Sequence, residues 1–431
     1  MNIKENSIKG LFFLLLILLF LPMLQFNFNW VKVNELGGYG IPPSNTSLTK
    51  HAWLDGNYQR EKEQYIKAHF GFCNWAIRLE HQIAFWGYGM SRVNGLIIGK
   101  ENYLYEPSYM KTRNGWGYLG ADRLTDLAKK TKAVQDTMRK MGKAFFFVIA
   151  PNKADYYPEY LPDKYARKKG DIPTNYTVFR EKLIHYGIDH LDINDWFMSM
   201  KDTTSIPLYG PMGIHYTTYG AAITAQRIFE ETERQLNKDL PDFYWDELVW
   251  DDNLRGSDDD LEKALNLAVK IPVEPLAYPK LLINKEGKYR PRAITIGDSF
   301  FWQLVNMGIE ERVFDKGQFW YYNREAYPGQ RKFVEVNYAA ELETAEVVFI
   351  IMTPPNMKKY LGPFIEHLYN FYFDKESMNG TENARIQEKM KQIRATPKWL
   401  KKVEAKAKAK GLPLKEMIYL DAKYVVDNEA K

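Results

Sequence analysis

Short apolar runs alternate with segments of helical periodicity through the middle of the chain. The run Ala144 to Ala150 is continuous and stops at Pro151, as expected for a central strand of a parallel sheet. Ala121 to Met141 places apolar side chains at helical spacing. The runs Arg292 to Ile296 and Val347 to Met352 predict two further strands. This alternation predicts an α/β fold, a three-layer sandwich with a mostly parallel sheet.

The remaining pattern adds shorter elements to this sandwich. It predicts strands within 93–105, 190–193 and 319–322, and helices within 66–84, 179–186, 218–236 and 300–307. In such folds ligands bind at the carboxyl ends of the strands. Residues 240–290, which include "DDNLRGSDDD", are acidic and irregular, and we interpret them as an insertion rather than a second catalytic domain.

The first thirty residues are apolar enough to enter a membrane. Lys4 and Lys9 precede an unbroken apolar run from Leu11 to Leu24, and flanking aromatic residues extend it to a spanning length. No small-x-small cleavage motif follows, which favours an uncleaved anchor over a signal peptide. Positive charge on the amino-terminal side places that end in the cytoplasm. We therefore predict an inner-membrane anchor at residues 8–30, with the remainder periplasmic or otherwise extracytoplasmic.

Three domains are expected from these patterns. Residues 1–30 are the anchor or signal segment, 31–375 the α/β domain with its insertion, and 376–431 a basic helical tail. A Lys-rich helix face is ordinarily solvated, although anionic lipid or polymer could bind it.

Composition narrows the function classes. The formal net charge of +5 is small for 431 residues, and a nucleic-acid binder would usually carry a sharper basic stripe. Cys73 is the single cysteine, so no intramolecular disulfide can form. The seven histidines show no HxxxH spacing, and no CxxC motif is present, so we predict neither a metal site nor a cofactor.

The segment "AITIGDSFF", residues 293–301, carries the strongest candidate chemistry. A hydrophobic strand runs directly into Gly297-Asp298-Ser299, followed by helix-compatible sequence. Such a turn would hold the Ser299 hydroxyl at the sheet edge, with backbone N–H groups of the following helix available to a developing oxyanion. The alternative is a plain turn in which serine caps a helix.

A nucleophilic serine needs a general base. His215, in "MGIHYTTYGA", lies in a loop directly before the predicted helix 218–236 and could reach across the sheet edge. The other histidines lie on amphipathic stretches, beside a predicted strand or in the amino-terminal region, where packing or surface roles are more common. We therefore predict Ser299 and His215 as the reactive pair.

Taken together, "GDSF" (297–300) and "GIHYTTYGA" (213–221) resemble the SGNH hydrolase-like domain of the alginate O-acetyltransferases AlgX and AlgJ. Further similarity lies in "IIGKENYLYE" (97–106), "VIAPNKADYYPEYLP" (148–162) and "EVVFIIMTPPN" (346–356). The His block precedes the Ser block, as in that family. The resemblance covers roughly residues 50–375.

The resemblance implies acetyl transfer to polysaccharide hydroxyls outside the inner membrane, with a membrane-bound O-acyltransferase supplying the acetyl donor. It assigns Ser299 as nucleophile and His215 as base, with the Ser299 N–H donating to the oxyanion and Asp298 beside it. Arg324, or less favourably Asn323, would complete the oxyanion or substrate site.

Two further groups are candidates for substrate contact. Asn152 and Lys153 follow a strand end and would line an acceptor groove, unless they form only a polar turn. Trp302, Trp320, Tyr321 and Tyr322 lie near Ser299 in sequence and would either stack a sugar ring or belong to the core.

One departure from the family pattern concerns the carboxylate that orients the base. The family motif is Asp-x-His-Trp, but Gly213 stands at the Asp position here. Either a backbone carbonyl orients His215, or a distant carboxylate such as Asp202 or Asp298 does, or catalysis has been lost. The sequence therefore predicts an acetyltransferase or esterase, with a catalytically silent polysaccharide-binding or assembly subunit as the alternative and a purely structural envelope protein as a third.

Overall fold

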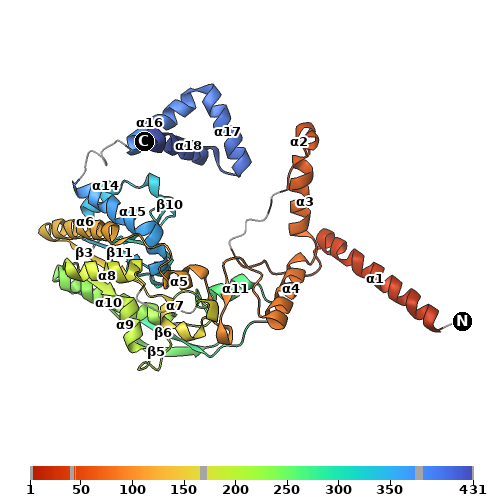
Figure 1. Ribbon diagram of the computed structural model, residues 1–431, viewed down its shortest axis with the longest axis horizontal. Coiled ribbons are helices and arrows are strands. Elements are labelled where there is room, and N and C mark those ends of the chain that lie inside the picture. The colour runs from red at the N-terminus through yellow and green to blue at the C-terminus, as the bar shows by residue number, and fades with distance from the viewer. Residues whose placement is uncertain (1–2, 39–42, 44, 166–171, 374–381, 430–431) are drawn as a thin grey trace.

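A seven-stranded mixed sheet forms the centre of the protein in a computed structural model, which describes residues 3–38, 43, 45–165, 172–373 and 382–429 (Figure 1). The strand order is β10-β9-β8-β7-β11-β3-β4. The strands are β3 (Ala144–Ile149), β4 (His190–Asp192), β7 (Ala293–Gly297), β8 (Gln318–Tyr321), β9 (Glu325–Tyr327), β10 (Arg331–Lys332) and β11 (Val347–Met352). Five of them pair in parallel, and β9 and β10 extend the sheet antiparallel at one edge.

Helices cover both faces of this sheet, so the predicted three-layer sandwich is confirmed. One face packs on α7 (Lys153–Tyr156), α9 (Ile193–Met200), α10 (Thr218–Leu236) and α12 (Trp302–Asn306). The other face packs on α6 (Ala121–Lys140), α8 (Asn175–His185), α14 (Tyr338–Thr344) and α15 (Pro354–Phe373). The central strands alternate between the two cores: Phe146 and Val148 of β3 face the first, and Phe145 and Phe147 face the second.

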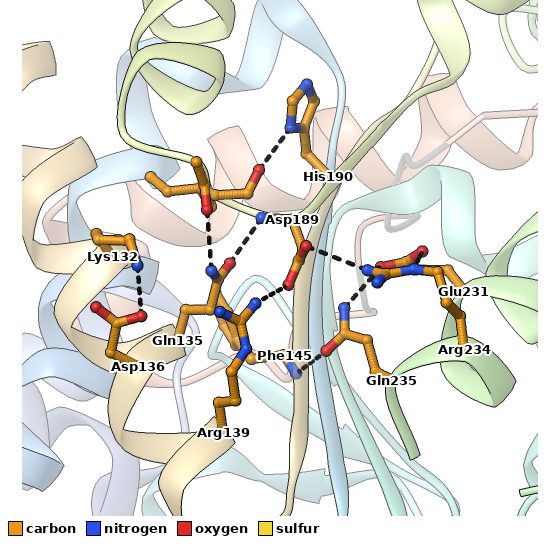
Figure 2. A network of polar contacts seen from close by, with 12 residues as sticks. Lys132, Gln135, Asp136, Arg139, Phe145, Asp189, His190, Glu231, Arg234 and Gln235 are labelled. Atoms are coloured by element: carbon orange, nitrogen blue, oxygen red, sulfur yellow. Dashed lines mark hydrogen bonds and ion pairs between the residues drawn. The ribbon is translucent and has the colours of Figure 1, made fainter. Parts of the chain in front are cut away.

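A polar network lies at the amino ends of β3 and β4 (Figure 2). Asp189 accepts hydrogen bonds from Arg139 of α6 at 2.6 Å and from Arg234 of α10 at 3.1 Å. The N–H of Phe145 donates to Gln235 Oε1 at 2.9 Å, because β4 is too short to pair with that part of β3. These contacts join the two helical layers at the amino ends of the strands. The functional groups described below lie at the opposite, carboxyl edge of the sheet.

The region predicted as an insertion is ordered. Its antiparallel hairpin consists of β5 (Asp242–Asp251) and β6 (Leu276–Asn284), and the segment between these strands contains the short helix α11 (Asp260–Leu265). Three buried leucines, Leu254, Leu261 and Leu265, join the first core. The insertion is therefore packed onto the domain beside the carboxyl edge of the sheet.

The amino-terminal part differs from the predicted pattern in one respect. The helix expected within 66–84 is two helices, α3 (Asn57–His69) and α4 (Cys73–Tyr88), separated by a turn at Gly71. Before them lie α1 (Ile3–Phe28) and α2 (Lys50–Leu54). Residues Ser7–Phe28 of α1 have a mean hydropathy of 2.4, and this segment is long and apolar enough to cross a membrane or to serve as a signal sequence.

Several short elements complete the described chain: β1 (Ile97–Ile98), β2 (Leu104–Tyr105), α5 (Pro107–Thr112), α13 (Ile309–Arg312) and 3-10 turns. At the carboxyl end, α16 (Glu382–Ala395), α17 (Pro397–Lys410) and α18 (Leu414–Glu429) pack on one another around their own apolar cluster. Lysines of α17 face solvent, as the periodic spacing of its buried Val403 and Ala407 requires.

Candidate active site

Ser299 lies at the carboxyl end of the central strand β7. The strand ends at Gly297, and Ser299 begins a 3-10 turn, η4 (Ser299–Phe301), that leads into α12. The side chain of Asp298 accepts a hydrogen bond from the N–H of Phe300 at 3.1 Å, which caps this turn. The N–H of Ser299 occupies the first position of the turn, where a backbone donor has no partner within the turn itself.

His215 reaches Ser299 from the loop before α10. Its Nε2 lies 3.0 Å from Ser299 Oγ, although the two residues are 84 positions apart. The loop is held in place by Tyr216, whose hydroxyl donates to the Phe300 carbonyl at 2.6 Å, and by Gln303, which donates to the Tyr216 carbonyl at 2.8 Å. The two sequence motifs are therefore bonded to each other through their flanking residues as well as through the reactive pair.

Asp260 supplies the carboxylate that is missing from the Asp-x-His-Trp position. Its Oδ2 lies 2.7 Å from His215 Nδ1, and its Oδ1 accepts the Ile214 N–H at 3.0 Å. The carboxylate thus fixes both the imidazole and the backbone that carries it. With Nδ1 as the donor to Asp260, the lone pair of Nε2 faces the Ser299 hydroxyl, which is the arrangement of a serine–histidine–aspartate triad.

Gly213 allows Asp260 to reach this position. A Cβ at residue 213 would lie 2.4 Å from the Ser257 carbonyl oxygen and 2.9 Å from that of Asp258. Any other side chain would displace the segment that leads into α11. The missing aspartate and the inserted segment are therefore structurally linked, because the backbone that brings Asp260 to the histidine fills the space where a side chain at 213 would begin.

The environment of His215 favours the imidazolium. Burial disfavours the charged ring, but the hydrogen bond and charge of Asp260, followed by the charges of Asp298 and Glu106, outweigh it and raise the pKa of His215 above its usual value. A raised pKa suits a general base that must hold the proton taken from serine.

The two carboxylates that the sequence offered as orienting groups lie elsewhere, and that expectation is corrected. Asp202 is exposed, after α9. Asp298 is fully buried, and its Oδ2 accepts from the Thr353 N–H at 2.8 Å, the Thr353 hydroxyl at 2.7 Å and Asn356 at 2.8 Å. Asp298 therefore joins the end of β7 to the end of β11, and with no exposed surface it does not line a substrate pocket.

Lys153 is close to the site but inside the protein. Its side chain has no exposed surface, and its Nζ donates to the Pro211 carbonyl at 2.8 Å and the Gly213 carbonyl at 2.6 Å. It thus holds the loop that carries His215, instead of lining a groove as predicted. Burial lowers the pKa of Lys153 to about 7, and the charge of Asp260 opposes this shift.

Asn152 is also buried, with 1% of its surface exposed. Its Oδ1 accepts the Ala154 N–H at 2.9 Å and so caps α7, while its own N–H donates to Asn194 at 2.8 Å. It borders a pocket of about 310 Å³ along the same sheet edge, lined also by Arg113, Asp155 and Asn194. The prediction that Asn152 contacts an acceptor stays a prediction.

The residues after β8 are divided between site and surface. Tyr322 contacts the site, because Asn356, which bonds Asp298, also donates to its hydroxyl at 3.2 Å. Arg324 is exposed, and its guanidinium lies 6.0 Å from the Tyr322 ring centre. Asn323 instead points to His367 of α15, with 3.1 Å between Asn323 Nδ2 and His367 Nδ1. Arg324 is thus better placed than Asn323 to meet a substrate.

The aromatic residues proposed as a sugar platform are mostly core. Trp320 is fully buried and faces the second core. Trp302 packs edge-on against Tyr321 and Tyr327, with ring centres 5.4 and 4.5 Å apart. Tyr322, which stacks obliquely on Tyr360 at 4.3 Å, is the member of the set that adjoins Ser299.

Among the residues that the structure describes, no group of three or more His, Cys, Asp or Glu is placed to hold a metal ion. What the site contains is a hydroxyl, an imidazole and a carboxylate in hydrogen-bonded series, at the start of a turn that follows a strand end. This set of groups is suited to nucleophilic acyl transfer through the serine oxygen.

A family model matches part of the chain. Residues 96–249 match the family model described as "SGNH hydrolase-like domain, acetyltransferase AlgX". That span includes His215 and ends before Asp260 and Ser299. No curated protein matches the chain.

Similar solved structures include the O-acetyltransferase domain of Pseudomonas putida AlgJ, with a TM-score of 0.40, 15% identity and coverage of 64% of this chain and 99% of that one. Pseudomonas aeruginosa AlgX has a TM-score of 0.40 and 14% identity, with coverages of 63% and 67%. Bacillus cereus PatB1 has a TM-score of 0.38 and 12% identity, with coverages of 62% and 99%.

The central mostly parallel sheet with helices on both faces is an SGNH hydrolase-like fold. Residues 96–249 are similar to the AlgX acetyltransferase domain, which confirms the resemblance found in the sequence motifs.

Proposed function

We propose that this protein is an O-acetyltransferase that moves acetyl groups onto hydroxyls of a polysaccharide outside the cytoplasmic membrane. The observation that carries the proposal is the continuous series Ser299–His215–Asp260, with 3.0 and 2.7 Å between the paired atoms. The AlgX-type match to residues 96–249 supports acetyl as the transferred group. The apolar helix α1 supports an extracytoplasmic location with α1 as an inner-membrane anchor.

The reaction has two half-steps. Ser299 Oγ attacks the acetyl carbonyl of the donor while His215 Nε2 takes the hydroxyl proton, and the Ser299 N–H stabilises the oxyanion. Collapse expels the donor's leaving group, which takes the proton from His215, and leaves an acetyl-serine. A sugar hydroxyl then gives its proton to His215 and attacks the acetyl carbonyl, and His215 returns that proton to Ser299 Oγ as the bond between Ser299 and the acetyl group breaks. Asp260 keeps its charge throughout and stabilises the imidazolium. The donor would reach the site from a membrane-bound O-acyltransferase.

Asp260 weakens the case for the silent binding subunit. That alternative rested on the missing aspartate together with the anchor and the aromatic richness of the chain, and a carboxylate now lies at hydrogen-bonding distance from His215.

A transfer assay tests the proposal. The full chain in detergent would be incubated with an activated acetyl ester and oligosaccharides, and acetylated sugars would be measured by mass spectrometry. We expect sugar esters with the wild type and none above background with Ser299→Ala. Ester hydrolysis that needs Ser299 but never yields acetylated sugar would instead identify an esterase. Oligosaccharide binding without turnover of the ester would favour the binding subunit.

A further inference from the structure

The helix α4 presents an apolar stripe that nothing in the described chain covers. Trp75, Leu79, Ile83 and Trp86 follow one another at helical spacing along one face, and 58%, 58%, 55% and 67% of their surfaces are exposed. Two tryptophans and two aliphatic side chains on one stripe form a continuous patch, unlike the scattered apolar residues that are normal on a soluble surface.

The opposite face of α4 is firmly docked, so the stripe is a fixed feature of the surface. Ala84 and Phe85 are buried there. The imidazole of His81, on that face, lies 2.7 Å from the Leu265 carbonyl through Nδ1. Gln82 is buried at the border of the stripe, where its Oε1 accepts the Val269 N–H at 2.8 Å. Both partners lie at or just beyond the end of α11, the helix that begins with Asp260. The stripe thus points outward from the same body that carries the orienting carboxylate.

The carboxyl end of α1 is held against the turn that precedes α4. A Cβ at Gly71 would lie 2.0 Å from the Pro22 carbonyl oxygen and 2.8 Å from the Gln25 Cβ, so the two backbones touch. Gln25 also closes the end of α1, because its side chain donates to the Val31 carbonyl at 2.6 Å and accepts the Val31 N–H at 3.1 Å. The exposed apolar helix and the exposed apolar stripe are therefore neighbours.

We propose that α4 is an interfacial helix whose stripe, Trp75, Leu79, Ile83 and Trp86, inserts into the outer surface of the lipid bilayer that α1 spans. The inference rests on the proposed role of α1 as an anchor. Lipid is the expected partner of the stripe because the contact at Gly71 brings α4 to the level where α1 leaves the bilayer. Figure 1 shows α4 running across the direction of α1 instead of continuing it, as a helix in the interface plane must. Tryptophan is also the residue preferred at that depth.

This arrangement has a consequence for the active site. The helix α4 is hydrogen-bonded to Leu265, the last residue of α11, and to Val269 beyond it, and α11 begins with Asp260. Contacts therefore run from the bilayer surface through α4 and α11 to Asp260. Docking of the stripe would fix the height and orientation of the triad above the membrane. A donor delivered by a membrane-embedded partner would then meet Ser299 at a constant position.

The test measures depth with a single fluorescent label. In the full chain carrying Cys73→Ser, a cysteine is introduced by Leu79→Cys, labelled with an environment-sensitive dye and reconstituted at one copy per lipid nanodisc. Matched proteins carry the label through Leu19→Cys in α1 or Lys129→Cys, which is exposed on α6. Lipids with a quencher near the headgroup report on proximity to the interface.

We expect quenching at position 79 several-fold stronger than at position 129, with a blue-shifted emission. Quenching at position 19 without quenching at 79 would overturn the interfacial helix and leave the anchor intact. Absence of quenching at position 19, by deep or shallow quenchers, would instead remove the anchor on which the inference rests. If the labels at position 79 of two copies contact each other in larger discs and lipid does not quench them, the stripe is a dimer interface and the proposal is overturned.

Discussion

Replacement of Asp260 by asparagine tests the triad with little change in shape. In Asp260→Asn the remaining side-chain oxygen can still accept the Ile214 N–H, which the aspartate accepts at 3.0 Å. The new amide nitrogen then faces His215 Nδ1, where Asp260 Oδ2 lies at 2.7 Å in the wild type. Because an amide N–H donates, His215 must place its own proton on Nε2. That tautomer cannot take the proton of Ser299.

The expected loss follows from this tautomer change. The same substitution in the serine-protease triad lowers kcat by about 10⁴, and we expect a loss on the order of 10⁴ here. By the conversion of about 1.36 kcal/mol per tenfold change in rate, this is about 5.4 kcal/mol of transition-state stabilisation. The rate of Ser299 acylation by an activated acetyl ester would be measured by quenched flow.

Asp258→Asn is the matched control. Asp258 is buried two residues away and accepts from the Thr218 hydroxyl at 3.1 Å, not from His215. The acylation rate of Asp258→Asn should stay within about threefold of the wild-type rate, which corresponds to about 0.7 kcal/mol of activation free energy. A loss below tenfold for Asp260→Asn, or equal losses for the two variants, would refute the assignment of Asp260 as the orienting carboxylate.

The pH dependence gives an independent check. Activity requires neutral His215, so acylation should rise with pH through the pKa of that residue, which lies above its usual value. Asp260 contributes to the raised pKa through its hydrogen bond and charge. In the residual activity of Asp260→Asn the rising limb should therefore move to lower pH.

Three stability predictions follow from the same region, each measurable by urea unfolding. Gly213→Ala should cost about 1–3 kcal/mol and reduce acylation, because its Cβ would lie 2.4 Å from the Ser257 carbonyl oxygen and displace Asp260; unchanged stability would contradict the close approach. Lys153→Met should cost about 1–3 kcal/mol for each carbonyl left unpaired, at Pro211 and Gly213. Above pH 7 the folded protein has lost the proton of Lys153, whose pKa is about 7, while the unfolded chain still holds it, so the wild type gains stability as pH rises. The stability lost in Lys153→Met should therefore grow from pH 7 to pH 9. A loss that is the same at both pH values would contradict the lowered pKa. Burial raises the pKa of Asp258 to about 7, so the contribution of this residue to the free energy of unfolding falls as pH rises from 4 to 7. The free energy of unfolding of Asp258→Asn should therefore rise relative to that of the wild type over this range. A difference between the two proteins that does not change with pH would contradict the raised pKa.

Local patterns predicted the fold well. The helix expected at 218–236 begins and ends at those residues, and the continuous apolar runs became the central strands β3 and β11. Ser299 and His215 could be found because each lies in a motif next to a well-marked element. Pro354 begins α15 two residues after the end of β11, because its missing N–H is tolerated in the first turn of a helix.

Asp260 could not be found from such patterns. It lies 45 residues from His215, in an acidic stretch whose local features indicate only a short helix start. Its role depends on the hairpin β5–β6 folding back on the domain and on the space left at Gly213, and neither is encoded by spacing along the chain. Lys153 was misjudged for a related reason: a lysine after a strand end is usually exposed, and its burial here depends on two carbonyls of a distant loop.

The most direct test of the central claim is peptide mapping of the acetyl-enzyme. Wild type, Ser299→Ala, His215→Ala and Asp260→Asn, each as the full chain in detergent, would be mixed with an activated acetyl ester, quenched in acid and digested. The account predicts one acetyl group on the peptide that contains Ser299 in the wild type, none in Ser299→Ala or His215→Ala, and a greatly slowed yield in Asp260→Asn. Acetylation of the wild type at another residue, or at Ser299 at the same rate without His215 and Asp260, would contradict it.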